Sequence, residues 1–373
     1  MKHEENCILG LLGAALFGKC ADWTAGAATD WQAVYRVAKE QGVYALVWEA
    51  IRRTEAEAIA SLEPKLKLRW GIRVMEREQR QERQWELANE LGADFAGKGL
   101  RTVVLKGWAT ARYYPVPAHR IGDDLDCFLG EGYEKGNEWA KQWGAPVVTK
   151  HFKHSQIYWK GLHVENHRYC SHLLFFSRRS RRFERVLQQL LREEGGLLPG
   201  SACLWGPSPK FELVFTVSHA WSHFLGEGLQ LRHLCDWAVL LERYGTELDV
   251  QEFRELLQIR GQGLLAFMES ITRMVHQYWG VKVPEGLVEN LTTGVAEQRL
   301  LDEIFQGRIR NFQQSVGKWR RRGYLLYHAV RLAWKFPKYQ GGVALWNILN
   351  NVTLFFVGEK GLLPSVQTGV CGA

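Results

Sequence analysis

Two aspartates separated by one residue are the strongest chemical signal in this chain. Asp124 and Asp126 alternate with the apolar residues Leu125 and Cys127. In an extended strand, alternate side chains share a face, so both carboxylates are expected on one face while their apolar neighbours pack into a core. Adjacent carboxylates repel each other unless they share a proton or bind a cation, and hard oxygen ligands favour Mg²⁺ or Mn²⁺. The pair therefore predicts a divalent-metal site; the alternative is a solvated turn after Gly122.

A lysine and a glycine lie upstream of the aspartates, and an arginine lies just before them. Residues 102–105 predict a short buried strand and residues 108–114 a helix, which puts Lys106-Gly107 at a strand-to-helix junction. Glycine at such a junction lets backbone amides approach phosphate oxygens, and Lys106 adds a full positive charge nearby. Arg120 either reaches a phosphate or holds the carboxylate loop, and both roles fit its position.

The elements that must position these residues form a small sheet between two helical regions. Before residue 99, apolar residues recur at three- and four-residue intervals, and a long charged helical pattern covers 66–95. The turn signal Lys160-Gly161 predicts a hairpin. The expected strands are 102–105, 121–129, 147–149, 155–159 and 162–167, and the expected helices after residue 99 are 108–114, 134–143, 183–194, 209–225, 229–244 and 250–279.

This succession predicts an α+β fold in which a small mixed sheet is flanked by N- and C-terminal helical domains. We expect an N-terminal helical domain at 1–98, a catalytic core at 99–180 and a C-terminal helical domain at 181–373.

The composition is that of a globular protein. The 373 residues are 46% hydrophobic, which is enough for a sizeable core and excludes a disordered or fibrous chain. The net charge of +8 suggests an anionic partner such as a nucleotide, a nucleic acid or a membrane surface. Seven scattered cysteines without a Cys-x-x-Cys motif argue against a disulfide scaffold or a zinc ribbon. The apolar run 8–18 reads as an opening helix and no segment has the roughly 18–20 uninterrupted apolar residues of a membrane span, so we expect a cytoplasmic protein.

Several motifs occur in an order that resembles a known family. They are Leu105-Lys106-Gly107, Arg112-Tyr113-Tyr114, Arg120, Asp124-Leu125-Asp126, Glu165-Asn166-His167, and finally His219, His223, Arg232 and Asp236. Over about residues 30–245 the chain resembles the uncharacterised nucleotidyltransferases with a Leu-Lys-Gly signature, within the DNA polymerase beta superfamily. The combination of motifs is specific, whereas each motif alone is weak.

The resemblance implies transfer of a nucleoside monophosphate from a nucleoside triphosphate (NTP) to an acceptor hydroxyl, with release of pyrophosphate. It implies that Asp124 and Asp126 hold two Mg²⁺ or Mn²⁺ ions. It also implies a third carboxylate on a neighbouring strand, which holds the ion that activates the acceptor, and Glu165 is the candidate. The acceptor stays open among a small molecule, a sugar, a peptide or protein side chain, and a nucleic acid end.

The local pattern around Glu165 agrees with this role. Apolar residues point to one face of the strand 162–167, and His163, Glu165 and His167 point to the other. The competing interpretation is an ion pair with Arg168 on the exposed side of an edge strand. For His167, a general base, a phosphate contact and a structural hydrogen-bond donor all stay open.

The chain departs from the superfamily pattern in two places. The superfamily usually has Gly-Ser at the start of the first core helix, whereas this chain has Lys106-Gly107 and therefore lacks the serine hydroxyl. An extra Asp123 precedes the metal pair. By alternation, Asp123 points away from Asp124 and Asp126.

Two groups of polar residues fall in the helical part. His219 and His223 lie four apart on one helical face, as a metal pair would, but no glutamate follows His219 as in a zinc protease, and we favour packing at a domain interface. Arg232 and Asp236 are spaced for an intrahelical pair, and an interface with the sheet also fits them.

Two rival functions come from other features. The basic clusters Arg178–Arg182 and Lys318–Arg322 suit an RNA-binding module whose affinity depends on salt and needs no magnesium, although a solvated helix face is the commoner explanation for such clusters. The second rival is a noncatalytic protein that keeps a nucleotide pocket and binds a partner through its helices.

Overall fold

The computed structural model describes residues 2–18, 29–54, 59–149, 152–171, 177–193, 195–225 and 228–306, so the basic cluster Lys318–Arg322 lies outside the described residues. The helices are α1 (His3–Phe17), α2 (Trp31–Glu40), α3 (Tyr44–Arg53), α4 (Pro64–Gly97), α5 (Trp108–Ala111), α6 (Tyr133–Gln142), α7 (Arg178–Leu190), α8 (Pro209–Leu225), α9 (Leu231–Tyr244), α10 (Val250–Arg260), α11 (Gln262–Trp279) and α12 (Val295–Gln306). The strands are β1 (Thr102–Val104), β2 (Asp124–Phe128), β3 (Val147–Val148), β4 (His154–Trp159), β5 (Leu162–His167) and β6 (Leu204–Trp205). None of these helices combines the length and the apolar character that crossing a membrane requires.

The six strands form one mixed sheet in the order β3-β4-β5-β2-β1-β6. β2 runs parallel to β5 and antiparallel to β1, and this pairing sets Asp126 opposite Glu165. The β4–β5 hairpin turns at Lys160 and Gly161, whose φ angles are 49° and 89°. The predicted turn is therefore confirmed, and it fixes which residues of β4 lie beside β5.

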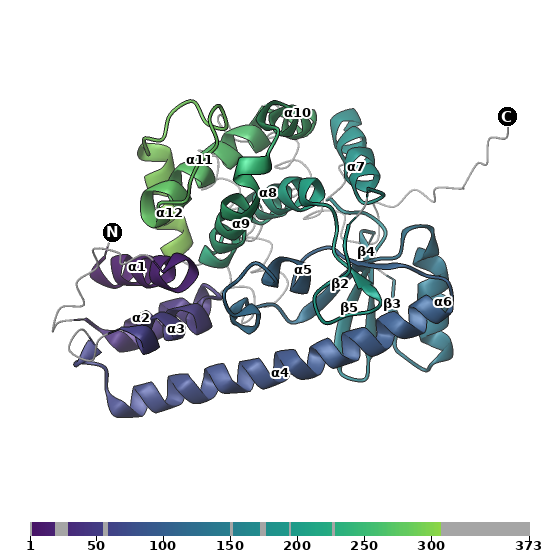
Figure 1. Cartoon of the computed structure of the whole chain (residues 1–373), viewed down its shortest axis with the longest axis horizontal. Helices are drawn as coiled ribbons and strands as arrows, with labels where there is room; N and C mark the ends of the chain where they lie inside the picture. Colours follow the sequence, from purple (N-terminus) through teal and green to yellow (C-terminus); the bar gives the residue numbers. More distant parts are fainter. Residues whose placement is uncertain are drawn as a thin grey trace, which may run out of the picture.

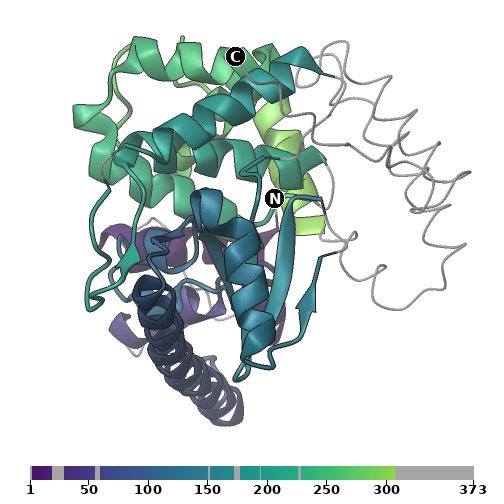
Figure 2. The ribbon, with the colours of Figure 1, turned by 90° about the vertical axis from the view of Figure 1, so that its right-hand side faces the viewer.

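The two faces of the sheet differ in character. Leu125, Cys127 and Val164 point to a face that packs, together with Phe95 of α4 and Ala140 of α6, in one buried cluster. Figures 1 and 2 show α4 running beneath the sheet and α6 lying along the strands. Because side chains alternate along β2 and β5, their acidic and imidazole groups lie on the opposite face.

The helices before and after the sheet share a second hydrophobic core. Residues of α1 to α3 pack in one cluster with residues of α8 to α12, and Trp279 Nε1 of α11 donates a 2.9 Å hydrogen bond to Leu9 O of α1. α4 joins both cores, because Trp70 in its first half lies in this cluster and Phe95 in its last turn lies against the sheet. Figure 1 shows α4 as one long rod under both parts. The domain boundaries at 98/99 and 180/181 stay predictions.

The predicted α+β class is confirmed, and the main differences are local. The single helix expected at 250–279 is wrong, because Gly261 interrupts it with φ 133° and separates α10 from α11. The helix expected at 108–114 has only the four residues of α5. β6, which pairs with β1 in parallel, was not expected because two residues are too short for a periodic signal.

Candidate functional site

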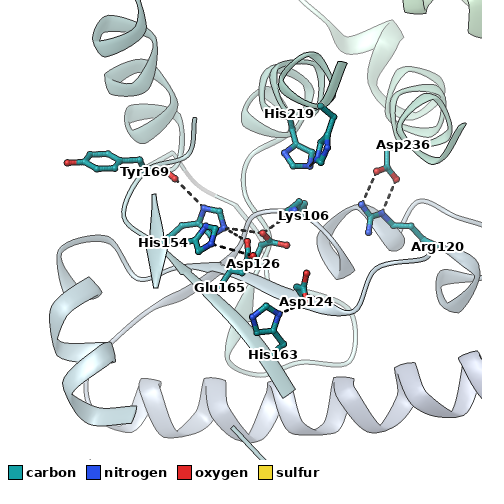
Figure 3. Close-up of polar contacts among 12 residues, drawn as sticks. Lys106, Arg120, Asp124, Asp126, His154, His163, Glu165, Tyr169, His219 and Asp236 are labelled. Carbon is teal, nitrogen blue, oxygen red and sulfur yellow. Dashed lines mark hydrogen bonds and ion pairs between the residues drawn. The ribbon is translucent and has the colours of Figure 1, made fainter. Parts of the chain in front are cut away.

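Three carboxylates converge on the polar face of the sheet. Asp126 of β2 is the direct neighbour of Glu165 on β5, and Asp124 lies two residues before Asp126 on the same face. Figure 3 shows their carboxyl groups gathered beside Lys106. The side chain of Asp126 is 4% exposed, that of Glu165 18% and that of Asp124 47%, so the group opens toward solvent at Asp124.

Lys106 and His167 contact the most buried carboxylate. Lys106 Nζ lies 3.2 Å and His167 Nε2 3.0 Å from Asp126 Oδ1. Burial alone would raise the pKa of Asp126, but Lys106, His167 and the nearby Lys153 together outweigh it and hold that pKa well below its usual value. Asp126 is therefore an ionised carboxylate in a largely dry environment.

His167 also links the two strands. Its Nε2 lies 3.4 Å from Glu165 Oε2, and its Nδ1 lies 3.2 Å from Tyr169 O, so both ring nitrogens face acceptors. Burial acts to raise the pKa of Glu165, but the contact with His167 helps to give a net lowering. His167 is fully buried behind Asp126 and Glu165 and holds both in place.

Two further histidines complete the surroundings of the carboxylates. His154 Nε2 of β4 lies 3.5 Å from Glu165 Oε1, and His163 Nδ1 lies 2.6 Å from Asp124 Oδ1. Sequence reasoning gave His154 no role. The hairpin register could have found it, because a turn at residues 160–161 places His154 opposite His167.

These residues fit a divalent cation. Nitrogen atoms of His154 and His167 and a carboxylate oxygen of Glu165 lie within 4.8 Å of one another, and Asp126 touches the same imidazole. Ionised oxygen donors at neighbouring strand positions match the preference of Mg²⁺ and Mn²⁺, while the imidazoles also suit softer metals. Asp124, Asp126 and Glu165 are thus brought together as expected, and their role as metal ligands stays a prediction.

Gly107 shapes the approach to the carboxylates from β1. Its φ of 71° and ψ of −110° belong to a turn conformation that favours glycine, and a Cβ there would lie 3.6 Å from Asp124 O. Leu105 N donates to Asp126 O at 2.9 Å, which fixes the end of β1 against β2. Lys106 is therefore held beside Asp126, whereas α5 is too short to add much dipole field.

Arg120 ties the carboxylate loop to α9. Its Nε and Nη2 donate to the two oxygens of Asp236 at 2.9 and 2.8 Å, and Tyr114 OH donates to the same carboxylate at 2.6 Å. Figure 3 shows this pair beside the carboxylate group. Two roles were open for Arg120, and this geometry fits the role of holding the carboxylate loop. Asp236 forms the expected interface with the sheet region.

Arg77 of α4 holds the same loop from the other side. It forms an ion pair with Asp123, and its Nη2 donates to Gly122 O at 2.7 Å. Asp123 therefore turns away from Asp124 and Asp126, as alternation predicted. Sequence reasoning missed Arg77, because it lies on an apparently solvated charged helix and only the fold brings it to the loop.

The Arg112-Tyr113-Tyr114 motif fastens α8 and α9 over the site. Arg112 Nη2 and Tyr113 OH donate to Glu212 Oε2 of α8 at 2.9 and 2.5 Å. Burial raises the pKa of Glu212 to about 7, against the lowering effect of Arg112. Together with the Tyr114 contact to Asp236, this network explains why a motif outside the carboxylate group matters for its geometry.

The histidines expected at an interface lie beside a small pocket. His219 Nε2 and His223 Nε2 of α8 are 3.2 Å apart, and His233 of α9 lies close to both. Lys106, Arg120, His219, His233 and other residues line this pocket, which adjoins the carboxylate group through Lys106. The arginines of the other basic cluster, Arg178–Arg182, are exposed on α7.

Comparison with known proteins identifies a family. A family model described as an uncharacterised nucleotidyltransferase matches residues 27–280, which is more than half of the chain. No curated protein and no solved structure matches significantly. The matched range includes the sheet, the three carboxylates, Lys106 and the histidines of α8 and α9. The chain therefore belongs to the uncharacterised nucleotidyltransferase family.

Proposed function

We propose that this protein is a metal-dependent nucleotidyltransferase of the DNA polymerase beta type. It transfers a nucleoside monophosphate from an NTP to an acceptor hydroxyl and releases pyrophosphate. The observation that carries the proposal is the convergence of Asp124, Asp126 and Glu165 from two neighbouring parallel strands beside Lys106. A noncatalytic nucleotide-binding protein has no need for three carboxylates at such an electrostatic cost.

In the proposed reaction, an acceptor oxygen attacks the α-phosphorus, and the bond from that phosphorus to the bridging oxygen breaks as pyrophosphate leaves. Asp124, Asp126 and Glu165 would hold Mg²⁺ or Mn²⁺, which when bound neutralises charge on the phosphate oxygens and lowers the pKa of the acceptor hydroxyl. Lys106 and the backbone at Gly107 lie where they would face the triphosphate. We assign His167 a positioning role, because both of its ring nitrogens already face protein acceptors.

The chemistry leaves the acceptor open among a small molecule, a sugar, a protein side chain and a nucleic acid end.

A reducing compartment such as the cytoplasm suits the cysteines, since Cys7, Cys127, Cys170, Cys203 and Cys235 are all free.

The test is metal-dependent binding of a nonhydrolysable NTP analogue, measured by calorimetry with Mg²⁺, with Mn²⁺ and with EDTA. We expect binding that requires metal in the wild type and is lost in the Asp124→Asn, Asp126→Asn double variant. Glu138→Gln, which changes an exposed carboxylate on α6, is the matched control and should bind as the wild type does. Metal-dependent binding that survives the double substitution would refute the site assignment.

Turnover is tested separately with each of the four NTPs and a cell extract as the source of acceptors. Pyrophosphate release is measured, and mass spectrometry searches for a product heavier by one nucleoside monophosphate. We expect one NTP to be consumed with Mg²⁺ or Mn²⁺. Metal-dependent NTP binding without any such product in extracts of the source cell would favour the noncatalytic alternative.

A further inference from the structure

The small pocket between Lys106 and the helices α8 and α9 is lined by hydrogen-bond donors together with the apolar residues Phe215 and Ala220. Lys106 and Arg120, which also pair with Asp126 and Asp236, bring positive charge to it. Thr216, His219 and His233 add polar groups. The acidic lining residue is Asp236, whose two oxygens already accept bonds from Arg120 and Tyr114. Figure 3 shows Lys106 between Asp126 and His219, so the pocket continues directly from the carboxylate group.

His233 carries an unused donor in this pocket. The backbone N–H of Gln230 donates to His233 Nδ1 at 3.1 Å and thereby closes a capping box at the start of α9. Nδ1 is therefore the acceptor of a neutral ring, and the proton lies on Nε2. His233 is 4% exposed, and its Nε2 has no hydrogen-bond partner among the residues that the structure describes. A buried donor of this kind is costly unless a water molecule or a ligand accepts from it.

The three histidines could also be taken for a transition-metal site. The 3.2 Å between His219 Nε2 and His223 Nε2 is close to the roughly 3.3 Å that separates two imidazole nitrogens across a tetrahedral zinc with bonds of about 2.0–2.1 Å. His233 argues against this, because a proton occupies the nitrogen that would have to ligate the metal. The charge around the cluster argues against it as well, since Lys106 and Arg120 repel a cation and attract an anion.

We propose that this pocket binds the terminal phosphate of the NTP, with His233 Nε2–H, Lys106 and His219 as its contacts. The inference rests on the proposed function and makes it more specific, since it places the pyrophosphate end of the substrate between the sheet and α8–α9. Neutral imidazoles suit this role, because burial, together with nearby cationic groups, lowers the pKa of both His219 and His233 well below the usual value. A neutral imidazole N–H such as His233 Nε2–H donates a hydrogen bond without holding pyrophosphate as tightly as a full charge would.

The probe for this inference is inorganic pyrophosphate, titrated calorimetrically into the full chain in EDTA so that metal ligands play no part. His233→Gln is the decisive variant, because glutamine at the third helical position preserves the capping box while the Nε2–H donor is lost. We expect this variant and His219→Gln to weaken pyrophosphate binding about 10- to 100-fold, the value of one hydrogen bond to a charged group. His276→Gln, at the far end of α11, is the matched control and should stay within twofold of the wild type.

Two results would overturn the inference. One is pyrophosphate affinity within twofold of the wild type in a His233→Gln variant that melts normally. The other is tight binding of one Zn²⁺ per chain that both histidine substitutions abolish. The outcomes separate the two proposals. NTP turnover together with unchanged pyrophosphate affinity in the histidine variants would refute the phosphate pocket alone. Histidine-dependent pyrophosphate binding without metal-dependent NTP binding would refute the proposed enzyme activity alone.

Discussion

Lys106 lies between two groups of histidines, one surrounded by carboxylates and the other by cationic side chains. The sheet cluster is His154, His163 and His167, and the helix cluster is His219, His223 and His233. Nitrogens of the sheet cluster lie 2.6 to 3.5 Å from carboxylate oxygens. The helix cluster lies among its own rings and the cations Lys106 and Arg120. The same type of side chain would therefore serve the proposed cation site on one side of Lys106 and the proposed anion site on the other.

Residue type and spacing alone misjudge the roles of these histidines. His219 and His223 have the four-residue spacing of a metal pair, yet the tautomer of His233 and the nearby charges favour an anion. His154 and His167 are 13 residues apart in the sequence, and the hairpin sets them side by side next to Glu165. The charge of the neighbours decides the role, and that charge is known only once the fold is known.

The largest effect is expected when the sheet side loses its negative charge. We expect the Asp126→Asn, Glu165→Gln double variant to lower nucleotidyl transfer at least about 10⁴-fold, because each lost group in such a site costs about 10² to 10³. Pyrophosphate release with the natural acceptor measures the effect. Pyrophosphate binding in EDTA should persist, and loss of both activities together would mean that the two sides are one site.

The next largest effect is expected where the two sides meet. Arg120→Met leaves Tyr114 as the remaining side-chain donor to the buried Asp236 among the described contacts, which should lower the free energy of unfolding by about 3 to 5 kcal/mol in urea titrations. The exposed pair Arg243–Glu247 is the control, since Arg243→Met should cost at most about 1 kcal/mol. Equal losses in the two variants would contradict the buried link.

A pH series sharpens the description of the helix cluster. The pKa of His219 is well below 6.5 in the folded protein because of burial and Lys106, so the unfolded chain binds more protons as pH falls through 6.5. The free energy of unfolding should therefore fall below that pH, by up to about 1.4 kcal/mol per pH unit for this histidine. His219→Gln should remove that share of the slope in urea unfolding between pH 7.5 and 5.

The slope must be read as a difference between variants, because Glu212 acts in the opposite direction. Burial raises its pKa to about 7, so its folded form keeps a proton that the unfolded chain loses, and its contribution to stability declines as pH rises from about 4.5 to 7. An identical slope in wild type and His219→Gln would show that His219 titrates normally.

The smallest effect is expected at the third aspartate of the loop. Asp123→Asn removes the exposed partner of Arg77, which keeps its bonds to Gly122 O and Gln81, so the cost in unfolding free energy should be about 1 kcal/mol or less. Metal-dependent NTP binding should stay within about threefold of the wild type. A loss as large as that of Asp124→Asn would place Asp123 among the metal ligands.

Much of the sheet could be predicted because its signals are local. The alternation Asp124-Leu125-Asp126 indicates which side chains share a face, and the same reasoning on 162–167 places Glu165 among polar neighbours; both placements are found in the structure. The Lys160-Gly161 turn is equally local. These signals repeat over a few residues, which is the range at which strand geometry constrains a sequence.

The supports of the site could not be predicted in the same way. Arg77 reaches Asp123 across 46 positions of sequence, and Arg120 reaches Asp236 across 116. No periodic pattern encodes such pairs, because they depend on how α4 and α9 dock against the sheet. The break at Gly261 was also missed, since helical periodicity continues on both sides of it.

Gly107 has a consequence for how this sequence can evolve. Its backbone conformation excludes side chains, whatever the space around it, while the glycine itself contacts little beyond Asp124 O. We therefore expect relatives of this chain to keep glycine at this position, whatever acceptor they use. Glycines such as Gly97, with ordinary torsions and open surroundings, should by contrast vary freely among relatives.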